Sequence, residues 1–247
     1  MANQSPEAHS NTQHNSYQRW YYESINKKTM RPSAGARYIA RQIDRMARIA
    51  QLDEAENILE VGCGQGRYSV PMLDSGYSLT CLDLSPVLLQ RMLDAARTPP
   101  RQVIACDLAE VAAHTGEQFD RAIGFFTLHH MHDLDDIFQG LAKVLKPGAV
   151  VAFCEPVAWN PLYYIQIALT PRMTWEGDGG VARMRPGLVL PALERAGFVD
   201  TRSTAFGFFP PFITNRGWGA AFETLLERAR VFAPLHAFQI FSATYRG

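Results

Sequence analysis

The sequence predicts an α/β protein built on a doubly wound, mostly parallel sheet. Between about residues 57 and 155, five short apolar segments alternate with helical segments, which is the pattern of parallel strands joined by crossover helices. The first apolar segment runs into a glycine turn. Polar side chains gather at the carboxyl ends of the others, where sheets of this class bind their ligands.

The first strand and its turn organise the chain. Residues 58–61 are apolar except for Glu60, and glycines follow at every second position: Gly62, Gly64 and Gly66. Glycine lacks a Cβ atom, so a ligand can lie directly on this backbone. The Glu60 carboxylate is costly to bury unless it meets a cation or good hydrogen-bond donors.

The remaining elements follow in order. We expect further strands over residues 77–82, 102–106, 119–126 and 149–154, and helices over 67–75, 87–96, 110–114 and 134–145. Ser85 fits the N-cap of the second of these helices, with Pro86 at its first position. Beyond residue 186 we expect a helix over 188–196, a sixth strand within 198–209, a helix over 218–231 and a final antiparallel strand over 237–244.

The glycine spacing separates two interpretations of the turn. Residues 62–66 read G-x-G-x-G and not the G-x-G-x-x-G of dinucleotide-binding proteins, which disfavours a dehydrogenase. With Glu60 before it, the turn resembles motif I of the class I S-adenosylmethionine-dependent methyltransferases. The resemblance implies a Rossmann-like methyltransferase fold and S-adenosyl-L-methionine as cofactor. It also implies that the methionine part of the cofactor is held by Glu60, Gly62, Cys63, Gly64 and Gly66.

The second and third strands end in acids. Asp83 lies roughly 20 residues beyond the glycine turn, where a carboxylate can accept both hydroxyls of a ribose. The family uses the same device, and residues 82–85 match its pattern, which adds Leu84 to the cofactor site. Asp107 resembles the family's acid that receives the adenine amino group. The backbone of Leu108 is then placed to bond the ring.

The segments around the fourth and fifth strands extend the resemblance. The Phe-Asp opening at 119–120, the Leu-His-His segment at 128–130 and the Lys-Pro-Gly turn at 146–148 look like those of ubiquinone-type and related small-molecule methyltransferases. In that family, residues just past the fourth strand border the cofactor methyl and the substrate. The resemblance therefore places Phe125 at the cofactor and His129 at the substrate.

Two residues are candidates for the catalytic base. His130 is preferred, as a base or a substrate contact, with a structural histidine as the alternative. Glu155 could act as base, bind an amine or cap the strand end. His129, His130 and His132 match no zinc spacing, so we expect no metal site.

The chain outside the sheet divides into further segments. We expect a disordered polar tail over 1–16, a helical lid over 17–50, the cofactor-binding core over 51–156, a substrate cap over 157–186 and the rest of the sheet over 187–247. Tyr22 belongs to an aromatic cluster that can fold over the cofactor. Some of Trp159, Tyr163, Tyr164 and Trp175 are expected to line the cap, unless the cap serves a dimer contact or simple packing.

One helix of the lid also carries a basic stripe. Residues 35–50 read as a helix with four arginines at helical spacing: Arg37, Arg41, Arg45 and Arg48. Two interpretations stay open. The stripe is either a solvated face or a patch for an anionic substrate or lipid surface.

Composition limits the remaining possibilities. The 247 residues have a formal net charge of zero, which disfavours nucleic acid as a partner. No apolar stretch reaches the length of a membrane span and the N-terminus lacks a signal-peptide core, so we expect a cytoplasmic protein with no integral membrane segment. The four cysteines suit small buried residues in a reducing compartment. A homodimer is left open.

These expectations combine into one prediction of function. The sequence predicts an enzyme that transfers a methyl group from S-adenosyl-L-methionine to a small organic acceptor, by O- or N-methylation in biosynthetic tailoring. C-methylation of a quinone or lipid-like precursor is the first alternative. A cofactor-binding regulatory or scaffold protein without transfer activity is an alternative of another class.

Overall fold

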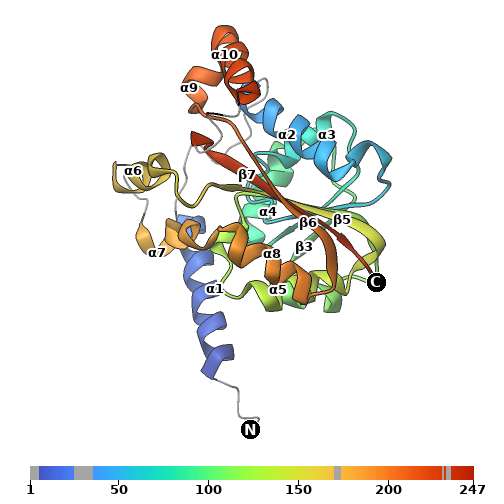
Figure 1. Cartoon of the computed structure of the whole chain (residues 1–247). Coiled ribbons are helices and arrows are strands. Elements are labelled where there is room, and N and C mark those ends of the chain that lie inside the picture. Colours follow the sequence, from blue (N-terminus) through green and yellow to red (C-terminus); the bar gives the residue numbers. More distant parts are fainter. Residues whose placement is uncertain (1–5, 25–35, 170–173, 230, 232–234) are drawn as a thin grey trace.

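The protein is described by a computed structural model that covers residues 6–24, 36–169, 174–229, 231 and 235–247. Seven strands form one sheet in the order β3-β2-β1-β4-β5-β7-β6 (Figure 1). Their bounds are β1 Ile58–Val61, β2 Leu79–Asp83, β3 Gln102–Ala105, β4 Phe119–Phe125, β5 Leu145–Pro156, β6 Phe198–Phe206 and β7 Phe238–Tyr245.

The strand directions confirm the predicted fold class. Strands β3, β2, β1, β4 and β5 pair in parallel, and β7 runs antiparallel to both of its neighbours, β5 and β6. The order reverses at β1, because β2 lies on one side of it and β4 on the other. This is the switch point outside which doubly wound sheets bind their ligands.

Helices cover both faces of the sheet and each face has its own apolar core. On one face, α2 (Arg37–Ala50), α3 (Ser69–Asp74) and α4 (Pro86–Ala95) contribute buried side chains such as Met46, Met72 and Met92. On the other, the 3-10 helix η3 (Leu108–Ala113), α5 (Leu134–Ala142) and α8 (Pro186–Arg195) pack Phe138 and Leu193 against the sheet. The Ser85 hydroxyl accepts a hydrogen bond from Leu88 N at 3.2 Å, which confirms the predicted cap of α4.

The N-terminal segment differs from the prediction. Helix α1 spans Pro6–Ser24 without a break, so it crosses the boundary expected at residue 16. The polar residues there have partners at the strand ends: His14 Nε2 lies 2.7 Å from the carbonyl oxygen of His130, and the Asn15 amide donates to Asp107. A polar composition signals disorder only when its side chains find no such partners. Residues 1–5 of the expected tail lie outside the described residues.

Two additions follow the core strands. After β5 come α6 (Pro161–Leu169), α7 (Trp175–Asp178) and the 3-10 helix η5 (Gly179–Arg183), which lie near α1 at one edge of the sheet (Figure 1). After β6, where the sequence predicted one helix, α9 (Pro211–Thr214) precedes α10 (Gly217–Arg228). None of the described helices has the length and apolar character needed to cross a membrane.

Helix α10 is held to α2 by charges on its inner face. The buried Glu223 carboxylate accepts hydrogen bonds from the backbone N–H groups of Phe208 (2.7 Å) and Phe209 (2.9 Å), and its other oxygen lies 3.3 Å from Arg41 Nε. Glu227 pairs with Arg45 Nη2 at 2.6 Å. Two arginines of the basic stripe are therefore used in internal ion pairs, an arrangement that neither predicted interpretation included.

We expect Glu223→Ala to destabilise the fold by about 3 kcal/mol, because it leaves two backbone donors without their acceptor and removes one of the two carboxylates that pair with Arg41. Chemical denaturation of both proteins measures the loss. Glu194→Ala, which removes an exposed carboxylate bonded only to Thr201 Oγ1 in the described structure, is the control and is expected to cost less than about 0.5 kcal/mol. Equal losses in the two variants would contradict the structural role of Glu223.

Candidate active site

A cavity of about 740 Å³ lies outside the carboxyl ends of the parallel strands. Its wall also includes residues of α1 and α6, so the N-terminal helix and the cap close over the switch point. The cavity is lined by most of the residues that the sequence singled out: Tyr22, Glu60, Gly62, Cys63, Gly64, Asp83, Leu84, Asp107, Leu108, Phe125, His129, His130 and Tyr163. Four others do not line it: Gly66, Glu155, Trp159 and Trp175.

The three glycines of the turn have different roles. Gly64 has a φ of 54°, and a Cβ built on it would meet nothing within 4 Å, so its backbone faces open space in the cavity. A Cβ on Gly62 would overlap the Thr127 side chain. A Cβ on Gly66, whose φ is 82°, would lie 2.6 Å from Met92 Cγ. Gly66 thus lets the turn pack on α4, which explains why this predicted cofactor contact lies outside the cavity wall.

Glu60 is the buried acid that lacks a full set of partners. Its side chain is buried among apolar strands, and Oε2 has no hydrogen-bond partner among the described residues. Burial raises the pKa of Glu60 to about 7, the Ser69 side chain lowers it in part, and the nearby Asp83 carboxylate adds to the increase. Glu60 lines the cavity, and a buried carboxylate with an unsatisfied oxygen is suited to a cationic group of a ligand.

Asp83 is fixed by the backbone on both sides. Its Oδ2 accepts a hydrogen bond from Gly64 N at 2.8 Å, and its Oδ1 accepts one from Ser85 N at 2.9 Å. Burial raises the pKa of this carboxyl group. Each carboxylate oxygen can accept a second hydrogen bond, so the pair can receive two neighbouring hydroxyl groups from the cavity.

Asp107 links the third strand to the N-terminal helix. Its Oδ1 accepts from Ala109 N at 3.0 Å and caps η3, whereas Oδ2 accepts from the Asn15 side chain. A nucleobase amino group at this position would share Oδ2 with Asn15. Asn15 was not a predicted site residue, because an asparagine in a polar run carries no signal of its own.

A buried histidine–glutamate pair lies between the ends of β4 and β5. Glu155 Oε1 accepts from the backbone N–H groups of Thr127 (2.8 Å) and Leu128 (2.7 Å), and Oε2 lies 2.6 Å from His129 Nδ1. Both side chains are buried, but only His129 lines the cavity. The other ring nitrogen, Nε2, lies 3.4 Å from the Tyr163 hydroxyl. Glu155 therefore orients His129 and does not itself face a ligand.

The neighbouring histidine is bound to the N-terminal helix. His130 Nε2 lies 2.9 Å from the Tyr22 hydroxyl, which also lies 3.3 Å from Asp178 Oδ1. The Tyr21 hydroxyl donates to Asp178 Oδ2 at 2.7 Å. Burial raises the pKa of both tyrosines, and the Asp178 carboxylate raises it further. Both phenols therefore remain neutral at physiological pH.

Residues of the cap also contact the backbone of residues 129–132. Arg183 donates to the carbonyl oxygens of His132 (2.6 Å) and Met131 (2.7 Å). Gly180 packs so closely on the carbonyl of His129 that a Cβ there would overlap it. The sequence did not single out Asp178, Gly180 or Arg183, and the one available signal was a turn-rich composition over residues 174–180.

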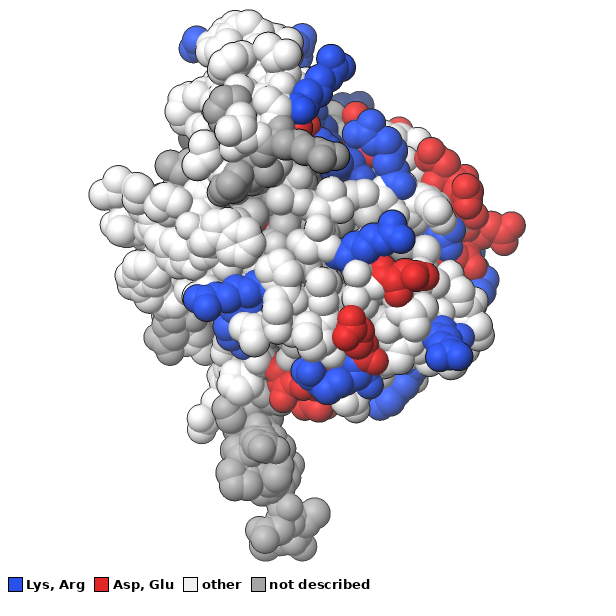
Figure 2. Space-filling view, in the orientation of Figure 1, with Lys and Arg blue, Asp and Glu red and all other residues white. Residues whose placement is uncertain are grey.

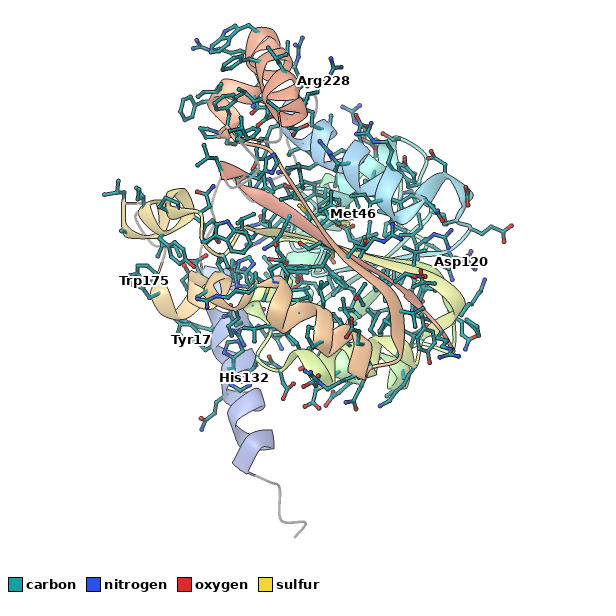
Figure 3. The ribbon with its side chains drawn as sticks, viewed as in Figure 1. Tyr17, Met46, Asp120, His132, Trp175 and Arg228 are labelled. Carbon is teal, nitrogen blue, oxygen red and sulfur yellow. The ribbon has the colours of Figure 1, made fainter. Side chains whose placement is uncertain are left out.

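The aromatic residues predicted for the cap lie at different places in the structure. Tyr163 lines the cavity, but Trp159 and Trp175 are 56% and 59% exposed. Figure 3 shows Trp175 at the outer edge of the cap, where its ring stacks with Tyr164 at a centroid distance of 6.0 Å. Hydrophobicity alone does not tell which side of a short helix faces the ligand. Within the described part of the chain, no group of three or more His, Cys, Asp or Glu side chains could hold a metal ion.

Comparisons with known proteins agree with this geometry. Residues 59–153 match the family model described as a methyltransferase domain. The chain is 36% identical over 97 residues to a malonyl-[acyl-carrier protein] O-methyltransferase of Salmonella typhimurium, covering 39% of this chain and 38% of that protein. It is 30% identical to a ubiquinone biosynthesis O-methyltransferase of Chelativorans sp. over 46% of this chain and 45% of that protein.

The chain thus spans less than half the length of both relatives. Its fold is similar to the crystal structure of an S-adenosylmethionine-dependent methyltransferase from Archaeoglobus fulgidus, with a TM-score of 0.61, 13% identity and coverage of 86% of this chain and 95% of that one. The family model, the two relatives and the similar structure all describe methyltransferases. The cavity at the ends of β1, β2 and β4 fits this class of protein. Residues 59–153 of this chain are thus similar to a methyltransferase domain, and its fold is similar to that of an S-adenosylmethionine-dependent methyltransferase.

Proposed function

We propose that this protein transfers a methyl group from S-adenosyl-L-methionine to a small organic acceptor. The observation that carries the proposal is the convergence of Glu60, Gly64 and Asp83 on one cavity at the switch point of the sheet. When bound, the cofactor supplies an electrophilic methyl group attached to a sulfonium sulfur. The task of the chain is to align the acceptor with that methyl group and to exclude water.

The residues present fit the cofactor. The unpaired Glu60 oxygen suits the ammonium group of the methionine part, and the open backbone at Gly64 leaves room for the chain of the ligand to pass. The fixed Asp83 carboxylate suits the two ribose hydroxyls. Asp107 and Leu108 then border the position of the base, with Asn15 as a neighbour.

His129 is the general base that the geometry supports best. When His129 donates its Nδ1–H to Glu155, the lone pair on His129 Nε2 points away from that carboxylate. An acceptor hydroxyl or amine that loses a proton on methylation can pass it to this nitrogen, and the Glu155 carboxylate then stabilises the imidazolium. His130 remains a second candidate; its Nε2 lies 2.9 Å from the Tyr22 hydroxyl, a closer contact than the 3.4 Å between His129 Nε2 and the Tyr163 hydroxyl.

The acceptor side of the cavity is largely aromatic. It is lined by Phe126, Tyr163, Phe208, Phe209 and Phe238. Such a wall favours a flat or apolar small molecule over a charged polymer. The two curated relatives are both named as O-methyltransferases, which supports O-methylation as the leading choice. N-methylation and C-methylation of a quinone or lipid-like precursor are the alternatives, and a cofactor-binding protein without activity is the alternative of another class.

We expect Asp83→Ala to weaken the binding of S-adenosylhomocysteine at least tenfold, or about 1.4 kcal/mol, because the ribose hydroxyls lose their acceptor. Isothermal titration calorimetry measures both proteins. Asp94→Ala, on the exposed side of α4, is the matched control and is expected to bind as the wild type does. The cofactor proposal is overturned if the wild type binds neither S-adenosylmethionine nor S-adenosylhomocysteine.

The raised pKa of Glu60 predicts a pH-dependent stability. The folded state holds the proton to about pH 7, whereas the unfolded chain releases it near pH 4.5. The free energy of unfolding of the ligand-free wild type therefore falls as pH rises from about 4.5 through 7. We expect the stability of Glu60→Gln relative to the wild type to increase by about 2 kcal/mol between pH 5 and pH 8. Denaturation curves of the two proteins that stay parallel over this range would contradict it.

The proposed base is tested with variants of both histidines. With an acceptor chosen from a panel of phenols, we expect His129→Ala to lower the single-turnover rate about 10²- to 10⁴-fold while S-adenosylhomocysteine still binds. Glu155→Gln should lower the rate less, because the ring keeps a hydrogen-bond acceptor but the imidazolium loses its counter-ion. A larger loss in His130→Ala than in His129→Ala would transfer the role to His130.

A further inference from the structure

Helix α10 has its apolar side on the outside. Trp218, Phe222 and Leu225 recur at the spacing of one helix face and are 61%, 47% and 60% exposed. The two glutamates of the helix face the opposite way and pair with α2. In a helix at a protein surface the apolar stripe normally faces the core. This reversal is typical of a helix whose outer face is covered by something else.

Exposed apolar side chains continue from α10 toward the cap. Phe212 of α9, and Ile165 and Leu169 of α6, are 72%, 49% and 77% exposed. Together with Trp218, Phe222 and Leu225, these residues are called the apolar rim below. In Figure 2 the edge formed by α6 is mostly white, and the red and blue side chains gather on the opposite side of the molecule. Isolated exposed apolar residues are common, but a group of this size marks an interaction surface.

The apolar rim borders the mouth of the cavity. Ile165 and Leu169 line the cavity from the cap, and Pro210 and Pro211 line it from the start of α9. Phe222 stacks on Phe209, a residue of the cavity wall, with ring centroids 5.8 Å apart and planes 13° from parallel. The rim and the acceptor side of the cavity therefore form one continuous apolar surface.

The charges beside the rim indicate what covers it. Residues 211–228 contain four charged side chains, and both acids, Glu223 and Glu227, are turned inward to arginines of α2. The other two, Arg216 and Arg228, are exposed. Helix α6 carries no charged residue. The exposed surface of this region is thus apolar and cationic, with an exposed tryptophan at the start of α10.

We propose that the apolar rim docks on the surface of an anionic lipid bilayer. Aromatic and aliphatic side chains enter the headgroup boundary, and Arg216 and Arg228 lie next to the lipid phosphates. A second copy of the chain fits less well, because the rim offers no exposed carboxylate to the arginines of a partner. The cavity mouth then faces the bilayer, so an apolar acceptor can enter from it; this last step rests on the proposed function, whereas the docking does not.

Vesicle co-sedimentation of the full-length chain tests the docking. At about 0.1 M salt we expect the protein to partition onto vesicles of phosphatidylcholine with one quarter phosphatidylglycerol, and less onto phosphatidylcholine alone. Phe222→Gln with Leu225→Gln should reduce partitioning at least tenfold. Arg216→Gln with Arg228→Gln should remove the preference for the anionic vesicles.

The controls separate docking from folding and from the cofactor site. Val87→Gln with Leu188→Gln changes two exposed apolar residues on α4 and α8, away from the rim, and should partition as the wild type does. All variants should bind S-adenosylhomocysteine as the wild type does, so a loss of docking is not a loss of fold. No partitioning by a wild type that binds S-adenosylhomocysteine would overturn the docking and leave the proposed function intact. The docking is equally overturned if light scattering finds a dimer that Phe222→Gln with Leu225→Gln dissociates while vesicles bind neither protein.

Discussion

The hydrogen bonds of Glu155 hold together the side of the cavity at the ends of β4 and β5. Its carboxylate lies at the end of β5 and accepts from two backbone N–H groups and the His129 ring, all in the segment that follows β4. Without this acceptor, two buried donors would be unpaired and the ring would lose its orientation. Arg183 holds the same segment from the cap and Tyr22 contacts it from α1. Three parts of the chain that are distant in sequence thus meet on residues 127–132.

The buried acids divide into two groups by whether their oxygens are satisfied. Glu155, Asp178 and Glu223 each have partners on both carboxylate oxygens, and each joins two elements of the fold. Glu60 is equally buried but one of its oxygens has no partner among the described residues. Burial of a carboxylate oxygen without a hydrogen-bond partner lowers the free energy of unfolding. This difference supports the proposal that Glu60 binds a ligand, whereas the other three acids hold elements of the fold together.

Much of the fold followed from local patterns in the sequence. Strands buried on both faces read as apolar runs, and Ser85-Pro86 marked the start of a helix, so the order of elements from β1 to β5 was predictable. Because parallel strands end at one edge, the positions of Asp83 and Asp107 at the cavity were also predictable. These inferences depend only on spacing along the chain.

The rest of the site depends on contacts between distant segments. Nothing local shows that Glu155 points at His129 and not at the ligand, or that Asp178 receives two tyrosine hydroxyls from α1. The continuity of α1 through residue 16 likewise depends on partners at the strand ends. Helical spacing correctly grouped Arg41 with Arg45, but the partners of both lie about 180 residues later in the chain.

The two halves of the cavity come from different parts of the sequence. The cofactor half is formed by residues at the ends of β1, β2 and β3, which lie inside the matched range 59–153. The acceptor half also uses Tyr22 before that range, and Tyr163, Phe208 and Phe209 after it. The proposed cofactor site therefore lies within the part of the chain that matches the family model, and much of the remaining wall lies outside it. Under the proposed function, the acceptor would be selected by α1, the cap and residues 208–211, whose side chains line the wall away from Glu60 and Asp83.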